Sequence, residues 1–154
     1  MRKSKRNSFF TFLLLIFLIG CERKPHVQWE PYSVEKLEEA VKLGRPVIAD
    51  FYAAWCGPCM MMKETTFTDP RVIEVLNSSV RLKADMSFSE SSKVREIAKR
   101  HKIYGYPTVI LFDASGNEVV RFGFVRAGQL LDILAKYAYQ LRPTQHLETK
   151  EGVK

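Results

Sequence analysis

Short apolar runs alternate with amphipathic segments between about residues 30 and 140. Runs rich in β-branched and aromatic residues predict strands, and apolar residues spaced three and four positions apart predict helices. The predicted strands are 47–52, 80–85, 108–112 and 118–122. The predicted helices are 34–43, 56–65, one that opens at Asp69-Pro70, 89–101 and 129–139.

Polar residues, Gly and Pro mark where several of these elements begin and end. Ser33 is the predicted N-cap of the first helix, and Gly44 ends that helix. Asp69 caps another helix, in which Pro70 suits the first helical position. The last two strands are joined by DASGN, a turn by composition, so they should pair antiparallel. The order of elements indicates an α/β fold with a mixed central β-sheet and helices on both faces.

The N-terminus has the pattern of an export signal. A basic leader, MRKSKRNS, precedes an 11-residue apolar run, Phe9–Ile19. About 20 apolar residues are needed to span a bilayer, so this run is short for a transmembrane helix and has the length and flanks of a secretory signal. The run leads into Gly20-Cys21, which resembles the bacterial lipoprotein signal, in which the cysteine is lipidated. The alternative is an ordinary signal, or an uncleaved anchor, with an incidental cysteine.

These features divide the chain into four predicted regions. We expect lipid on Cys21 to attach the protein to a bacterial membrane outside the cytoplasm, where disulfides can persist. The globular domain would then stand alone behind its anchor. The regions are a lipoprotein signal peptide at 1–20, a tether at 21–28, a domain at 29–141 and a polar tail at 142–154.

Positive charge is concentrated in the leader. The net charge is +7, and four of the 24 basic residues lie in positions 1–20, which contain no Asp or Glu. The rest of the chain has 20 basic and 17 acidic residues, a net charge of +3. This balance is a weak argument for nucleic-acid binding, and no basic stripe with interleaved aromatic residues occurs.

Two of the three cysteines, Cys56 and Cys59, lie three positions apart. They could form a structural disulfide, half of a metal site or a redox pair. A structural disulfide with so short a loop would constrain the unfolded chain little. A metal site needs further soft ligands, and methionines 60–62 have the helical spacing of core and rim residues. No paired spacing occurs among the histidines, which are His26, His101 and His146.

A redox pair fits the position of the cysteines best. Cys56 follows a buried strand and begins a helix, where unpaired N–H groups and the helix dipole favour thiolate over thiol. The thiolate is the attacking species in disulfide exchange. We therefore expect Cys56 to attack and Cys59, one turn further on and deeper inside, to resolve the mixed disulfide. Pro58 suits an early helical position, where its missing N–H would find no partner.

Two motifs carry a resemblance to a known family. Trp55-Cys56-Gly57-Pro58-Cys59 after a buried strand resembles the active site of the thioredoxin superfamily, and Tyr106-Pro107-Thr108 resembles its cis-proline loop. The similarity covers about residues 30–140. Within the superfamily, DFYAAWCGPC, KETTFTDPRV and YGYPTVILFDASGNEV are similar to the C-terminal thioredoxin-like domain of the DsbD family of transmembrane thiol-disulfide reductases.

The resemblance implies roles for further residues. Asp50 matches the buried aspartate of the superfamily, and an unpaired carboxylate there would have a raised pKa and could accept the proton of Cys59. Arg81, rather than Lys83, is favoured as the cation that tunes Asp50. Trp55 is expected to cover the disulfide, with plain core packing as the alternative. The expected substrate-binding residues are Trp55, Gly57, Pro58, Tyr106 and Pro107.

The Gly-Pro pair between the cysteines resembles the reducing members of the superfamily, so we expect a reductase of protein disulfides. An isomerase, an oxidase or an apocytochrome c thiol reductant is the alternative within the class. No Gly-rich phosphate loop occurs, so we expect no cofactor and recharging by another protein. A membrane thiol-electron donor of the DsbD or CcdA type is the expected source. A non-catalytic thioredoxin-fold interaction lipoprotein and a metal chaperone are alternatives from other classes.

Overall fold

The computed structural model describes residues 25–143, which fold around one five-stranded sheet. The strand order is β1-β3-β2-β4-β5; β3 runs parallel to both β1 and β2, β4 is antiparallel to β2, and β5 is antiparallel to β4. The predicted mixed sheet of the α/β class is confirmed, with one further short strand, β1. The strands are β1 (Glu30–Pro31), β2 (Val47–Tyr52), β3 (Val80–Asp85), β4 (Thr108–Phe112) and β5 (Glu118–Phe122).

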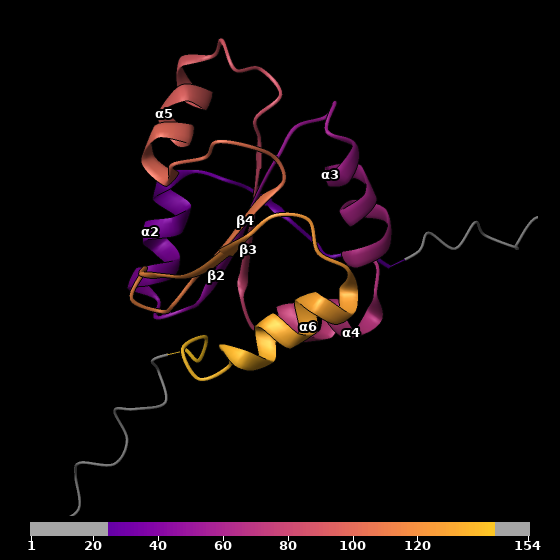
Figure 1. Ribbon diagram of the computed structural model, residues 1–154. Coiled ribbons are helices and arrows are strands. Elements are labelled where there is room, and N and C mark those ends of the chain that lie inside the picture. The colour runs from indigo at the N-terminus through magenta and orange to yellow at the C-terminus, as the bar shows by residue number, and fades with distance from the viewer. Residues whose placement is uncertain (1–24, 144–154) are drawn as a thin grey trace, which may run out of the picture.

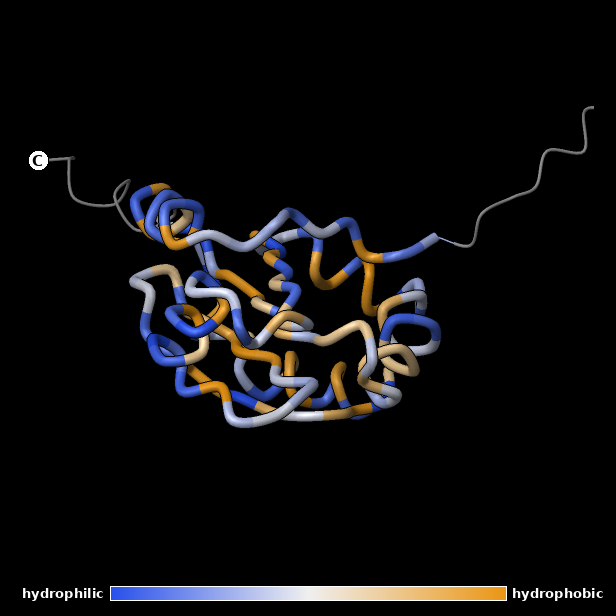
Figure 2. The backbone as a smooth tube through the Cα atoms, turned by 90° about the horizontal axis from the view of Figure 1, so that it is seen from above, coloured by the Kyte–Doolittle hydropathy of each residue, from blue (hydrophilic) through white to orange (hydrophobic). Residues whose placement is uncertain are grey.

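Helices cover both faces of the sheet (Figure 1). Two of them, α2 and α5, pack on one face, while α3, the π-helix η1, α4 and α6 pack on the other. Figure 2 shows apolar stretches running mainly through the interior and hydrophilic stretches toward the outside. No helix within residues 25–143 is long and apolar enough to span a bilayer. The helices are α2 (Val34–Lys42), α3 (Gly57–Met61), η1 (Met62–Thr66), α4 (Pro70–Leu76), α5 (Ser92–His101) and α6 (Ala127–Lys136).

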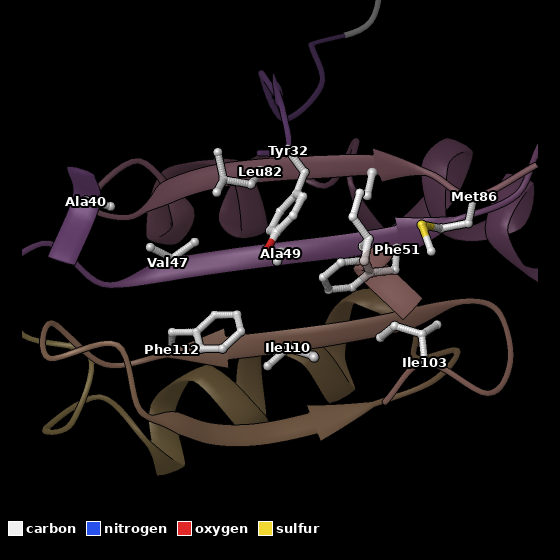
Figure 3. Packing of buried hydrophobic residues seen from close by; sticks show 12 residues of the cluster. Tyr32, Ala40, Val47, Ala49, Phe51, Leu82, Met86, Ile103, Ile110 and Phe112 are labelled. Atoms are coloured by element: carbon white, nitrogen blue, oxygen red, sulfur yellow. The ribbon is translucent and has the colours of Figure 1, made fainter. Parts of the chain in front are cut away.

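The core beneath α2 and α5 takes alternate residues of the central strand. Successive side chains of a strand point to opposite faces, and Val47, Ala49 and Phe51 face this side (Figure 3). Tyr32 and His101 also lie here, buried and joined by a hydrogen bond between the Tyr32 hydroxyl and His101 Nε2. Burial raises the pKa of Tyr32 to about 12.

The opposite core joins the other residues of β2 to η1, α4 and α6. Ile48 packs there with Met62 and Phe67. Val27 belongs to the same cluster, with 1% of its surface exposed, and its N–H donates to the Phe67 carbonyl at 2.9 Å. Val27 lies in the segment predicted as the tether, 21–28, and it packs on the domain two residues before Trp29.

Helix ends follow the predicted caps where a side-chain cap is present. Ser33 Oγ accepts the N–H of Lys36, and Asp69 Oδ1 accepts the N–H of Arg71. Two of the helices without such a predicted cap shift: α5 starts three residues later than expected, and α6 occupies 127–136 rather than 129–139. The predicted single helix after Cys56 becomes α3 followed by the π-helix, in which the Phe67 N–H bonds the Met62 carbonyl five residues back.

Gly116 in the β4–β5 turn gives a test of the backbone geometry. Its φ is +84°, and a Cβ there would lie 2.9 Å from Val41 Cγ2. We expect Gly116→Ala to lower the free energy of unfolding by about 1–3 kcal/mol, because both the left-handed backbone and the contact are unfavourable for alanine. Urea denaturation measures the change. Gly128→Ala is the matched control: apart from neighbouring backbone of its own helix, no heavy atom lies within 4 Å of its added Cβ. An equal loss of stability in both variants would contradict this account.

Candidate active site

The predicted cysteine pair lies at the start of α3, shortly after the end of β2. Cys56 and Cys59 are joined by a disulfide bond, with their Cα atoms 5.3 Å apart. Cys56 is the N-cap of α3, and its Sγ accepts the N–H of Cys59 at 3.2 Å. A first-turn N–H that would otherwise lack a partner is therefore directed at this sulfur. The same N–H can stabilise a thiolate on Cys56 once the disulfide is reduced.

Both cysteines are recessed beneath more exposed neighbours. Cys56 is 6% exposed and Cys59 is 5% exposed, and they pack with Ala53 against Tyr52 and Tyr106. Little of the disulfide is therefore exposed, and Cys59 lies in the first turn of the helix that Cys56 caps.

Trp55 stands beside the disulfide with 70% of its surface exposed. Its Nε1–H donates to the Ser87 carbonyl at 3.3 Å, and its ring meets that of Tyr106 edge-on, with centroids 5.7 Å apart. The alternative of plain core packing for Trp55 is therefore wrong. The residue joins three loops around the cysteines: its own, the loop after β3 and the loop before β4.

The predicted proline loop lies next to this tryptophan. The Tyr106–Pro107 peptide bond is cis, as predicted. Pro107 is buried, and a Cβ placed on Gly123 would lie 3.6 Å from the Pro107 carbonyl, so the β5–α6 loop passes close by. Gly57 and Pro58, which lie between the two cysteines in the sequence, are exposed. The expected substrate-binding residues thus occupy one end of the sheet together with the disulfide.

Asp50 is buried in the middle of β2, 3% exposed, on the face of the sheet that Ile48 and the α3–η1 helix share. Its Oδ2 lies 2.9 Å from Lys83 Nζ on the adjacent β3. Burial raises the pKa of Asp50, and the nearby Lys83 ammonium opposes that rise without cancelling it. Asp50 is therefore a carboxyl group that can hold a proton more readily than an exposed one.

The cation beside Asp50 is Lys83, and the expectation of Arg81 is wrong. The two strands pair with Asp50 opposite Lys83, whereas Arg81 lies opposite Ile48 and bonds Asn77 Oδ1 and the Leu76 carbonyl. The Lys83 ammonium also lies over aromatic rings, which favours a cation there. The rings are those of Tyr52, Trp29 and Phe67, with centroids at 4.4, 5.4 and 5.9 Å.

A groove of about 1050 Å³ runs between residues 26–29 and the cysteine-bearing helix. Met60 and Lys83 line it. Of the three methionines, Met62 is in the core and Met61 is half exposed, so their positions are those of core and rim residues. Within residues 25–143, no cluster of three or more His, Cys, Asp or Glu could hold a metal ion.

One side-chain hydrogen bond joins the helix that carries the cysteines to the β5–α6 loop, which lies close to Pro107. Thr66, at the end of η1 and fully buried, donates its hydroxyl to the Val125 carbonyl at 2.8 Å. Sequence reasoning noted the surrounding TFTDP segment but assigned Thr66 no role. The predicted lipidation site Cys21, the signal peptide, the first four tether residues and the tail from 144 onward lie outside the described residues.

This fold and site define a class of protein. A mixed sheet between two helical layers, a C-x-x-C disulfide at a helix start and an adjacent cis-proline loop are the features of a thioredoxin-like domain. The family profile of the thioredoxin-like domain matches residues 34–138, and the chain belongs to this family.

Two relatives of this chain within the family are both named DsbD. The thiol:disulfide interchange protein DsbD of Ralstonia nicotianae is 43% identical over 110 residues, 68% of this chain and 18% of that protein. DsbD of Salmonella typhi is 39% identical over 88 residues, 56% of this chain and 15% of that protein. The chain thus spans less than a fifth of these relatives.

Solved structures agree on the fold. A thioredoxin from Thermus thermophilus is 27% identical with a TM-score of 0.61, over 74% of this chain and 88% of that one. The C-terminal domain of Neisseria meningitidis DsbD in its oxidised form shares the fold at 24% identity, with a TM-score of 0.58 over 70% of this chain and 91% of that one. Together with the Cys56–Cys59 pair, these relationships support thiol–disulfide oxidoreductase chemistry at this site.

Proposed function

We propose that this protein reduces disulfides in other proteins by dithiol–disulfide exchange, outside the cytoplasm and attached to a membrane through Cys21. The observation that carries the proposal is the Cys56–Cys59 disulfide at the start of α3, with an N–H directed at the Cys56 sulfur. A pair in this position can alternate between dithiol and disulfide, because the helix start stabilises the attacking thiolate.

The first half of the reaction uses the reduced protein. The Cys56 thiolate attacks one sulfur of the substrate disulfide, forms a mixed disulfide, and releases the other substrate sulfur as a thiolate that takes a proton. Trp55 and Tyr106 flank the sulfur, so the approaching substrate segment lies against them. The exposed Gly57 and the adjacent Pro107 loop leave space for that segment.

The second half needs a thiolate on Cys59. We assign Asp50 as the proton acceptor, because its raised pKa and its position beneath the cysteine-bearing helix suit it to take a proton from a buried thiol. The Cys59 thiolate then attacks Cys56 Sγ and expels the substrate sulfur. The substrate leaves as a dithiol, and the protein keeps the disulfide; two electrons have passed to the substrate.

Before it can reduce another substrate, the protein needs two electrons from another dithiol, which convert its disulfide back to the dithiol form. A membrane thiol-electron conduit of the DsbD or CcdA type would supply them. The support for this assignment is the similarity to DsbD, a thiol:disulfide interchange protein by name, and the predicted anchor that would hold the domain close to a membrane donor.

The reduction potential of the Cys56–Cys59 couple tests the direction of electron flow. A reductase should have a potential nearer the thioredoxin value of about −270 mV than the DsbA value of about −120 mV. Equilibration with glutathione or dithiothreitol buffers measures it, and thiol trapping in cells reports the redox state. A potential near −120 mV with a mostly oxidised pool would assign the protein to the oxidases instead.

A further inference from the structure

Trp29 precedes the part of the chain that the family profile matches, residues 34–138, yet it lies beside the buried ion pair of the site. It belongs to an N-terminal segment, residues 26–31, that packs on the domain. The Val27 N–H donates to the Phe67 carbonyl at 2.9 Å, which fixes the segment two residues before Trp29. Directly after Trp29, the two residues of β1 pair with β3 at the edge of the sheet. The indole is therefore held in place from both sides along the chain.

Three aromatic rings lie around the ammonium group of Lys83, and Trp29 provides one of them. The ammonium nitrogen lies 5.4 Å from the centre of the Trp29 ring, 4.4 Å from that of Tyr52 and 5.9 Å from that of Phe67. The rings of Trp29 and Phe67 also meet edge-on, with centroids 4.9 Å apart. The same nitrogen lies 2.9 Å from the Asp50 carboxylate, and only 18% of the Lys83 side chain is exposed. These groups therefore replace most of the water around the ammonium.

The aromatic rings restrict where the ammonium can go. A cation near a ring face is attracted to the π electrons, and the attraction is stronger where water is excluded. A lysine side chain is a flexible four-carbon stem, so without the rings its ammonium could turn toward either of two grooves that Lys83 lines. One groove lies between residues 26–29 and the cysteine-bearing helix, and the other lies beside β1 and α5. Trp29 lines both grooves, so its ring stands where the ammonium would otherwise leave Asp50.

We propose that Trp29 is a positioning residue for the resolving step, because its ring keeps the Lys83 ammonium against Asp50. This inference rests on the proposed function and extends it to a residue outside the matched part of the chain. Asp50 takes the proton of the Cys59 thiol, and Cys59 Sγ then attacks Cys56 Sγ and expels the substrate sulfur. The ammonium sets the pH above which the carboxyl can accept that proton, and Trp29 acts on this pH through the ammonium.

Lys83 is the charged group that opposes the effect of burial on Asp50. Burial raises the pKa of Asp50, and the charge and hydrogen bond of Lys83 lower it. A weaker hold on the ammonium therefore leaves the pKa of Asp50 higher. The other ionisable side chains that line the two grooves are, besides Tyr32 and Tyr52, His26, Glu30, Lys63, Glu64, Asp85 and Lys93. A substitution of Trp29 removes none of these charges, so a change in the titration of Asp50 reports the position of the ammonium.

An NMR titration of the oxidised protein tests the inference without using its activity. The carboxyl carbon signal of Asp50, assigned with Asp50→Asn, gives the midpoint of the titration in wild type and in Trp29→Leu, which keeps an apolar side chain but has no ring. We expect the midpoint to lie about 0.5–1 pH unit higher in Trp29→Leu, because a cation–π contact of a mostly buried ammonium is lost. Trp29→Phe restores a ring face and should return most of the difference.

Stopped-flow kinetics follows the same carboxyl group through the reaction. The reduced protein is mixed with an aromatic disulfide that releases coloured thionitrobenzoate. The first release reports attack by Cys56, and the second, whose rate is independent of reagent concentration, reports attack by Cys59. Asp50 must be ionised to take the Cys59 proton, so the second release slows as the pH falls through the pKa of Asp50. In Trp29→Leu this slowing should begin about 0.5–1 pH unit higher, and the first release serves as the internal reference.

Val27→Ala is the matched control, because it loosens the same segment without removing the ring. It should lower the stability in urea and leave the Asp50 midpoint at the wild-type value. An unchanged midpoint in Trp29→Leu, or an equal rise in Val27→Ala, would overturn the role of the Trp29 ring and leave the reductase proposal standing, since the titration involves no substrate. An unfolded chain titrates near the ordinary value of 3.8, so the folded protein of a less stable variant still gives its own midpoint.

The proposed function fails by a different result. If the wild type neither releases the second thionitrobenzoate nor reduces insulin, the reductase proposal is overturned, while the NMR titration still decides whether Trp29 positions the ammonium.

Discussion

Replacing Cys56 with serine is expected to abolish insulin reduction, down to the uncatalysed background. A serine hydroxyl cannot form the mixed disulfide, and the residue 59 N–H that is directed at the Cys56 sulfur has no thiolate to stabilise in this variant. The turbidity of precipitating insulin B chain, with dithiothreitol as electron source, measures the rate. Activity equal to wild type would rule out the catalytic account and favour a binding role for the fold.

Cys59→Ser is the matched variant, because it removes the other half of the same disulfide. We expect multiple turnover to be lost here too, but with a different product: the Cys56 thiolate still attacks, and no thiol remains to release the substrate. Non-reducing gel electrophoresis should show covalent adducts in Cys59→Ser and none in Cys56→Ser. The reverse pattern would exchange the roles of the two cysteines.

Lys83→Met should be strongly destabilising, with a loss of about 3–5 kcal/mol in the free energy of unfolding at pH 8. The ammonium group 2.9 Å from Asp50 is the counter-charge of a carboxylate that is almost wholly buried, and methionine leaves that charge unpaired. Arg81→Met is the matched control, because Arg81 lies on the same strand and faces no buried carboxylate. Denaturant unfolding of both variants measures the difference.

The loss in Lys83→Met should depend on pH through Asp50. Burial raises the pKa of this carboxyl in the folded protein, and removal of the ammonium raises it further. Keeping Asp50 ionised therefore costs stability as the pH rises through that folded-state pKa. Below the ordinary value of 3.8 the carboxyl is protonated in both folded and unfolded chains, and its contribution to the loss disappears. In an Asp50→Asn background, Lys83→Met should cost much less; an equal cost there would mean that the two side chains do not interact.

The four longer strands were predictable to the residue, because each is a short stretch rich in β-branched or aromatic residues, apolar throughout or, as in 80–85, alternating with polar residues. The sequence could not reveal β1, since Glu30–Pro31 is two residues long and pairs only through its backbone. The π-helix was equally hidden: MKETT has no proline or glycine, and backbone hydrogen bonds to the carbonyl five residues back, such as that from Phe67 to Met62, distinguish it from an α-helix.

The cysteines and the proline loop were identified because their motifs are local. The partner of Asp50 was not, since Arg81 and Lys83 lie on the same face of β3 and the register of two parallel strands decides between them.

Thr66 has a consequence for the movement of the site. Its hydroxyl joins the end of the cysteine-bearing helix to Val125, in the loop whose Gly123 lies against Pro107. We therefore expect the cysteine-bearing helix and this loop to keep the same spacing in the oxidised and the reduced protein, whichever sulfur Cys56 is bonded to.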